Sequence, residues 1–144
     1  MEIKVLGDSK SRKGLVYSLS TFFAQALKID GDSTVVKVYS IPRLTKDKNW
    51  NGCVARMSPT EIHVLVDSRL DPNKLVVTLA HEFVHVKQHV RGEVKSYKKR
   101  NGETGWIWMG RVNNASYANM PWEIEARKRE KVLANKLRRL IAKG

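Results

Sequence analysis

Hydrophobic and polar positions along the chain follow two different periods, which predicts a fold that combines helices with strands. Across residues 12–27 the apolar positions recur every three or four residues, the period of a helix with one buried face. The members of this stripe are Leu15, Leu19, Phe22, Phe23 and Ala26. Either Ser9 or Ser11 can cap the helix, and Gly31 follows its end.

Alternation of period two predicts strands at residues 1–6, 33–41, 53–57 and 61–66. The first of these patterns is short and fits a strand or an ordered leader equally. Pro42 ends the second strand, because proline cannot donate to a strand ladder. A turn at residues 58–60 joins the last two strands into a hairpin. Together with the helices, these strands predict an α+β fold built on a small, mostly antiparallel sheet of three to four strands.

A second helix begins at Pro72, with Asp71 as its cap, and continues to about Val90. On a helical wheel its side chains separate into two faces. The apolar face holds Leu75, Val76, Leu79, Phe83, Val86 and Val90, and the other face holds Thr78, His81, Glu82 and His85. This segregation is typical of a helix that packs on a core with one side and borders a polar site with the other.

The chain changes character after Val90. Residues 43–51 and 91–105 are polar, and the second of these stretches fits a mobile loop or an irregular hairpin. Residues 106–110 form an apolar patch that either packs over the core or walls a substrate cleft. A last helix begins at Pro121 and continues to about Ile141, with an apolar stripe of Trp122, Ala126, Leu133, Leu137 and Leu140.

Composition limits the classes of protein to which these elements can belong. The chain has 144 residues and 42% hydrophobic content, which suits one domain spanning residues 1–144. We expect a monomer in a cytosol, not a secreted or membrane protein, because no apolar run approaches ~20 residues and the first residues do not resemble a signal peptide. Cys53 is the single cysteine, so a metal site must use histidine and carboxylate ligands; Cys53 itself is expected to be a small apolar filler.

The net charge of +13 is far from zero. Such a surface attracts phosphate backbones, acidic proteins or anionic membranes, or it only keeps a small protein soluble. Residues 127–143 carry eight basic side chains and one acid, Glu130, and a second basic group lies at residues 95–100. No motif for reading bases is present, so contact with nucleic acid would be nonspecific.

The polar face of the second helix carries the chemistry. His81 and His85 are four residues apart, so both imidazoles can reach one ion, and Glu82 leans toward the same cleft. His89 is too far along the helix axis to join them, and His63 lies on a strand that can face either the cleft or solvent.

A catalytic zinc takes three protein ligands and leaves one position for water. Since no cysteine lies nearby, a carboxylate on the last helix, Glu123 or Glu125, is expected as the third ligand. The other explanation for these acids is that they complement the helix dipole.

Two motifs carry a resemblance to a known family. His81-Glu82-Phe83-Val84-His85 followed by Glu-x-x-Ala on a later helix resembles the gluzincin branch of zinc metallopeptidases. Tyr117, four residues before Pro121, is also similar to small phage-type predicted metallopeptidases grouped with SprT-like proteins. The resemblance implies a zincin-like fold and Zn²⁺ bound by His81, His85 and Glu123. Arg127 stands where the family often has Asp or Asn, so Glu125 stays open as an alternative ligand.

The resemblance also implies a function. A metallopeptidase would hydrolyse a peptide or protein substrate through a zinc-bound water, with Glu82 as the general base. Tyr117 is the candidate oxyanion partner, or it packs in the core; strand 61–66 would pair with an extended substrate. Two alternatives stay open: a protein whose basic surface brings the peptidase to DNA-bound substrates, and a module that binds zinc without catalysis. DNA retention that falls with added salt would favour the first of these.

Overall fold

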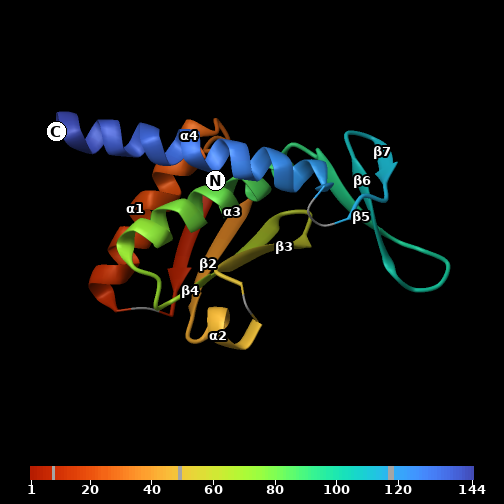
Figure 1. Cartoon of the computed structure of the whole chain (residues 1–144), viewed down its shortest axis with the longest axis horizontal. Helices are drawn as coiled ribbons and strands as arrows, with labels where there is room; N and C mark the ends of the chain where they lie inside the picture. Colours follow the sequence, from red (N-terminus) through yellow and green to blue (C-terminus); the bar gives the residue numbers. More distant parts are fainter. Residues whose placement is uncertain (8, 49, 117–118) are drawn as a thin grey trace.

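The computed structural model describes residues 1–7, 9–48, 50–116 and 119–144, and these residues form an α+β arrangement of helices with two sheets (Figure 1). The helices of the described residues are α1 (Lys10–Ala26), α2 (Leu44–Lys48), α3 (Pro72–Val90) and α4 (Pro121–Lys143). The larger sheet contains, in spatial order, β1 (Glu2–Leu6), β2 (Val35–Ile41), β4 (Glu61–Asp67) and β3 (Gly52–Ser58). Helix α3 lies between this sheet and α4, so it is the central layer of the molecule (Figure 1).

The pairing of the larger sheet differs from the antiparallel sheet that the sequence predicts. β1 pairs with β2 in parallel, β2 pairs with β4 in parallel, and only β3 runs antiparallel to its neighbour, β4. The prediction of a mostly antiparallel sheet was therefore wrong for this sheet. The reason is that α1 returns the chain from the end of β1 to the start of β2, and parallel neighbours need a crossover of this kind.

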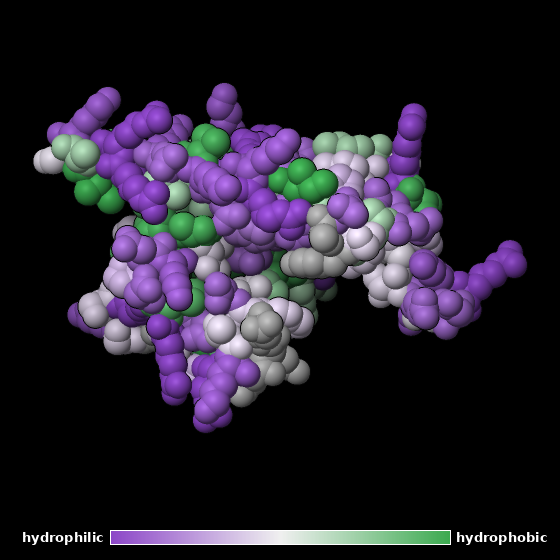
Figure 2. Space-filling model, in the orientation of Figure 1, coloured by the Kyte–Doolittle hydropathy of each residue, from purple (hydrophilic) through white to green (hydrophobic). Residues whose placement is uncertain are grey.

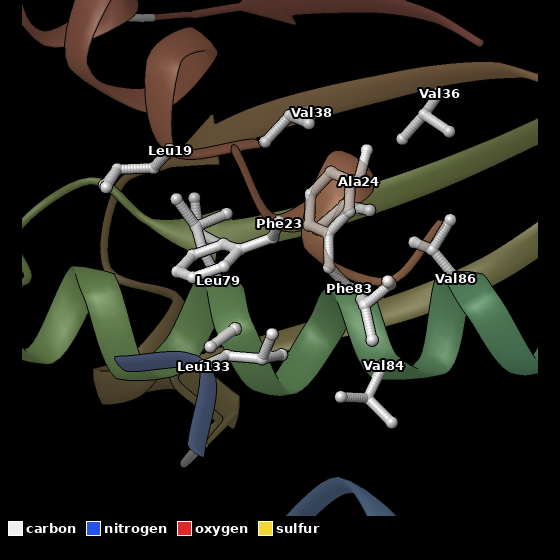
Figure 3. Packing of buried hydrophobic residues seen from close by; sticks show 14 of the residues in the cluster. Leu19, Phe23, Ala24, Val36, Val38, Leu79, Phe83, Val84, Val86 and Leu133 are labelled. Carbon is white, nitrogen blue, oxygen red and sulfur yellow. The ribbon is translucent and has the colours of Figure 1, made fainter. Parts of the chain in front are cut away.

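The core lies between the sheet and two helices. In β4 the side chains of Ile62 and Val64 are fully buried, while the alternate positions stay half-buried, as the period of two predicts. Figure 3 shows Phe23 of α1 and Phe83 of α3 meeting between the strands and α3. Val84 points from the opposite side of α3, so this helix buries two of its faces (Figure 3).

Helix α3 begins at Pro72 as predicted, whereas α1 begins at Lys10, two residues before the predicted start, with Ser9 rather than Ser11 as its cap. The Ser9 side chain accepts a hydrogen bond from the backbone N–H of Arg12 at 3.3 Å, and Asp71 accepts one from the N–H of Lys74 at 2.9 Å. Leu19 and Phe23 of the predicted stripe of α1 are buried, but Leu15 is 40% exposed and its neighbour Val16 is fully buried instead. Two adjacent apolar residues give a sequence pattern no means of deciding which one faces the core.

The polar segment that the sequence assigns to a loop contains the short helix α2. Its first turn is held by Asp67 at the end of β4, whose carboxylate accepts hydrogen bonds from the backbone N–H groups of Thr45 at 2.6 Å and Arg69 at 2.8 Å. Only 3% of the Asp67 side chain is exposed. Burial works against the charge of this carboxylate, but the two backbone donors outweigh it and lower the pKa of Asp67.

Asp67 therefore makes stability depend on pH. Because its pKa is lower in the folded than in the unfolded chain, its contribution is present above the unfolded value of about 4 and is lost as the pH falls through the folded value. We expect Asp67→Asn to lower the free energy of unfolding by about 2 kcal/mol at neutral pH, since one charged acceptor of two hydrogen bonds is removed. Urea unfolding should show this deficit shrinking in acid. A deficit that stays the same at every pH would contradict this role.

The second sheet occupies the stretch expected to be a mobile loop or irregular hairpin. Strands β5 (Val94–Lys98), β6 (Thr104–Trp108) and β7 (Arg111–Asn113) pair antiparallel in chain order. Of the two alternatives the hairpin is correct, and a third strand extends it. The rings of Trp106 and Trp108 lie 5.8 and 6.1 Å from the ring of Trp122, which joins this sheet to the first turn of α4.

Helix α4 packs on α3, and its C-terminal end extends past the rest of the molecule (Figure 1). Ala126, Leu133 and Leu137 of the predicted stripe are buried, but Leu140 is 57% exposed because it lies on the projecting end. Figure 2 shows hydrophilic residues over most of the outer surface of α4. Within the described part of the chain, no helix combines the length and the apolar content that crossing a membrane requires.

Candidate metal centre

Two helices bring three possible metal ligands together. His81 and His85 lie one turn apart on α3, and their Nε2 atoms are separated by 3.2 Å. Glu123, in the first turn of α4, places one carboxylate oxygen 3.2 Å from Nε2 of His81 and the other 2.9 Å from Nε2 of His85. The ligand atoms all lie within 4.8 Å of one another. Pro121 starts α4 and Trp122 packs on Trp106, and together they position Glu123 beside the two histidines of α3.

These separations fit a zinc ion. Donor atoms about 2.1 Å from a tetrahedral zinc lie about 3.4 Å from one another, and the three contacts above are close to that value. Two imidazoles and one carboxylate are also a ligand set that leaves a fourth position for water or substrate. His81, His85 and Glu123 could therefore hold a metal ion through two imidazoles and one carboxylate.

The far side of each imidazole faces an oxygen atom. Nδ1 of His81 lies 3.5 Å from a carboxylate oxygen of Glu130, and Nδ1 of His85 lies 2.8 Å from the amide oxygen of Gln88. In a neutral ring the hydrogen therefore sits on Nδ1, and a lone pair remains on Nε2. The lone pairs on the two Nε2 atoms and the charge of the Glu123 carboxylate repel one another unless a proton or a metal ion lies between them. This convergence is what a metal-binding site requires.

Glu130 and Gln88, the outer partners that contact the Nδ1 atoms of the two histidines, are not part of the sequence prediction. The resemblance places an orienting Asp or Asn at position 127, but the structure puts the carboxylate of Glu130 beside His81 instead. Glu130 lies two helical turns after Glu123, so it returns to the same face of α4. That spacing is the signal that could have identified it. Gln88 is likewise three residues after His85 on α3, although a glutamine at this spacing has no distinctive meaning in a sequence.

The electrostatics of the centre favour a cation. Burial opposes a charge on His81, but its contacts with Glu123 and Glu130 outweigh this and raise the pKa of His81 to about 10. Burial would raise the pKa of Glu123, but the two histidines lower it well below its usual range. The surroundings therefore hold Glu123 ionised and stabilise positive charge at the point where the three side chains meet.

Glu82 has a different environment from Glu123. Its side chain is 6% exposed, and burial raises the pKa of Glu82 to about 7. A carboxylate with such a pKa can accept a proton and release it again near neutral pH, as a general base must. Gly52 of β3 permits this placement, because a Cβ atom there would lie 3.1 Å from Cγ of Glu82 and 2.8 Å from the backbone oxygen of Leu65.

A cavity of about 420 Å³ opens over these residues. His81, Glu82, His85 and Glu123 line it together with β3, and its remaining walls include Trp50, Trp106 and Trp122. Within the apolar patch at residues 106–110, Trp106 packs on Trp122 and lines the cavity. Cys53 of β3 lines the cavity too, and burial raises the pKa of its thiol.

Comparison of the chain with protein-family models, curated proteins and solved structures found no match. The assignment of the centre therefore depends on its own geometry.

The structure separates the two candidates for the third ligand. Glu123 contacts both histidines, whereas the carboxylate of Glu125 points elsewhere and contacts Lys87 at 2.7 Å and the amide nitrogen of Gln88 at 2.8 Å. Successive residues of a helix point about 100° apart, and two positions differ by about 200°, so only one of these acids can face the histidines.

The remaining histidines are outside the group of ligands. His89 lines the same cavity but is not among the metal-ligand atoms of the described residues, in agreement with its exclusion on spacing. His63 faces away from the cavity, where its ring lies 2.9 Å from a carboxylate oxygen of Glu61 and packs on Tyr39. Tyr117, the candidate oxyanion partner, lies outside the described residues.

Proposed function

We propose that this protein is a zinc-dependent metallopeptidase with a zincin-like fold, in which His81, His85 and Glu123 hold the metal. The observation that carries the proposal is the convergence of these three side chains, at 2.9 to 3.2 Å, in an open cavity that also contains Glu82. Buried polar groups cost free energy unless they are paired, and here the ligand-type side chains pair with one another at the point where a metal ion would lie.

A zinc ion bound here supplies Lewis acidity to a water molecule and to the carbonyl group of a substrate. The carboxylate of Glu82 accepts a proton from the attacking water and then passes it to the nitrogen of the leaving amine. Burial raises the pKa of Glu82, which makes this carboxylate a stronger proton acceptor than an exposed glutamate. Contacts of the two Nδ1 atoms with Glu130 and Gln88 would leave both Nε2 atoms available to the metal.

The substrate groove we propose follows β3. The sequence suggests strand 61–66 as the pairing edge, but this strand, β4, lies between β2 and β3 and its backbone groups are already paired. The free edge beside the metal centre is that of β3. Its residues border both the 420 Å³ cavity and a second cavity of about 660 Å³, and His89 and Val94 line both. An extended peptide laid along β3 would occupy the two cavities in turn.

The direct test is to measure zinc and proteolysis in one preparation. We expect the purified protein to bind one zinc per chain and to cleave an unfolded protein substrate, with cleavage stopped by a chelator and restored by added zinc. Zinc bound without any cleavage would support the alternative of a binding module. Absence of zinc binding after exposure to excess metal would contradict the proposed centre itself.

A further inference from the structure

The side chain of Gln88 is completely buried at the contact between the two ligand-bearing helices. Its amide oxygen lies 2.8 Å from Nδ1 of His85. Its amide nitrogen donates to the backbone oxygen of Trp122 at 2.9 Å and to the carboxylate of Glu125 at 2.8 Å. One side chain therefore contacts a ligand histidine on α3 and, on α4, both Trp122 immediately before Glu123 and Glu125 two residues after it.

These partners determine which way the amide points. The oxygen of Trp122 and the carboxylate of Glu125 can only accept hydrogen bonds, so the NH₂ group of Gln88 must face them. The amide oxygen is then the only group left to face His85. Since this oxygen accepts, Nδ1 of His85 must carry the hydrogen, and the lone pair stays on Nε2.

The carboxylate of Glu125, which accepts a hydrogen bond from Gln88, is itself held in place. Lys87, whose side chain is 2% exposed, places its ammonium group 2.7 Å from Glu125 and 2.8 Å from Glu93. The carboxylate of Glu125 therefore accepts from the ammonium group of Lys87 with one oxygen and from the amide of Gln88 with the other. The order of contacts runs from Lys87 through Glu125 and Gln88 to His85.

We propose that Gln88 is a positioning residue of the metal centre: it holds His85 with Nε2 toward the metal and fastens the turn of α4 that carries Glu123 to α3. The inference rests on the proposed metal site. It adds that one buried amide both aligns α3 with α4 and determines which nitrogen of His85 carries the hydrogen. An orienting partner of this kind typically changes metal affinity about 10- to 100-fold.

The test replaces Gln88 by methionine, which keeps the length of the side chain and removes every hydrogen bond. We expect Gln88→Met to weaken zinc binding about 10- to 100-fold in competition with a chelator. In the zinc-loaded wild type, the Nδ1 hydrogen of His85 should give a slowly exchanging proton resonance in NMR spectra, and this resonance should disappear in Gln88→Met. Wild-type affinity together with a retained resonance would overturn the proposal.

Two further variants separate positioning from general stability. Glu93→Gln removes a charge next to Lys87 but leaves the contacts of Gln88 intact, so it should keep wild-type zinc affinity. Glu125→Ala leaves Gln88 its bond to Trp122 and should weaken zinc binding only a few-fold, less than the ~10- to 100-fold expected when a direct partner of a ligand histidine is lost. A purely structural role for Gln88 predicts lower thermal stability with an unchanged His85 resonance, and that result would also overturn the proposal.

The design distinguishes failure of this inference from failure of the proposed function. If Gln88→Met does not fold, Glu125→Ala carries the test: its predicted few-fold loss of zinc affinity supports the proposal and an unchanged affinity opposes it. If the wild type binds no zinc, the metal centre is wrong. The inference, which rests on that centre, then falls with it, whereas zinc binding by the wild type together with unchanged affinity and an unchanged His85 resonance in Gln88→Met overturns the inference alone.

Discussion

Replacing Glu82 by glutamine should leave zinc bound and slow peptide hydrolysis about a thousandfold. Glutamine has nearly the same shape, so the buried site stays filled, but its amide cannot accept the proton that the attacking water must lose. The amide is also neutral, which suits a side chain that is 6% exposed and whose carboxylate already has a raised pKa. Folding should therefore be unaffected. Metal content and the rate of cleavage of an unfolded protein, measured on the same sample, give the result.

Glu61→Gln is a matched control for this variant. It makes the same chemical change at a carboxylate that contacts Lys37 and His63 on the strand face away from the cavity. We expect it to keep full activity. Full activity in Glu82→Gln would show that another group removes the proton, and it would sink the assignment of Glu82 as the general base.

The second large effect concerns the two acids of α4. We expect Glu123→Ala to lose zinc by more than the ~10- to 100-fold that outer partners cause, because it removes one of three direct ligands. Glu125→Ala should lose only a few-fold, since its carboxylate contacts Lys87 and Gln88 and not the metal site. Equilibrium dialysis against zinc measures both affinities, and thermal unfolding of each metal-free variant shows whether the fold is intact.

This pair of variants is its own control, because both remove a carboxylate from the same turn of one helix. Equal losses would mean that the turn as a whole matters and that neither acid is a direct ligand. A larger loss in Glu125→Ala would reverse the assignment of the third ligand.

Local patterns of the sequence predict the parts of the fold that depend on neighbours along the chain. The caps at Ser9 and Asp71, the alternation of β4 and the two faces of α3 all arise from interactions within a few residues, and the structure agrees with each. Pairing of strands depends on residues far apart. For that reason the parallel partners of β2 were missed, although its own residues were identified as a strand.

The candidate site also has one part that local sequence patterns predict and another that depends on packing between distant elements. His81, Glu82 and His85 are close in sequence and share one face of one helix, so their proximity follows from helical spacing alone. The choice of Glu123 over Glu125 depends on how α4 is rotated against α3, which no single helix determines. Glu130 and Gln88 were missed because their roles exist only once the two helices are packed together.

The division of the ligands between α3 and α4 has a consequence for synthesis of the protein in the cell. A ribosome that has delivered His81 and His85 has made only two of the three ligands, and the third arrives 38 residues later with Glu123. The N-terminal turn of α4 must also dock on Trp106 and Gln88 before that carboxylate reaches the histidines. Under the proposed function, a nascent chain therefore carries no assembled peptidase centre, and its own unfolded segments are not exposed to one.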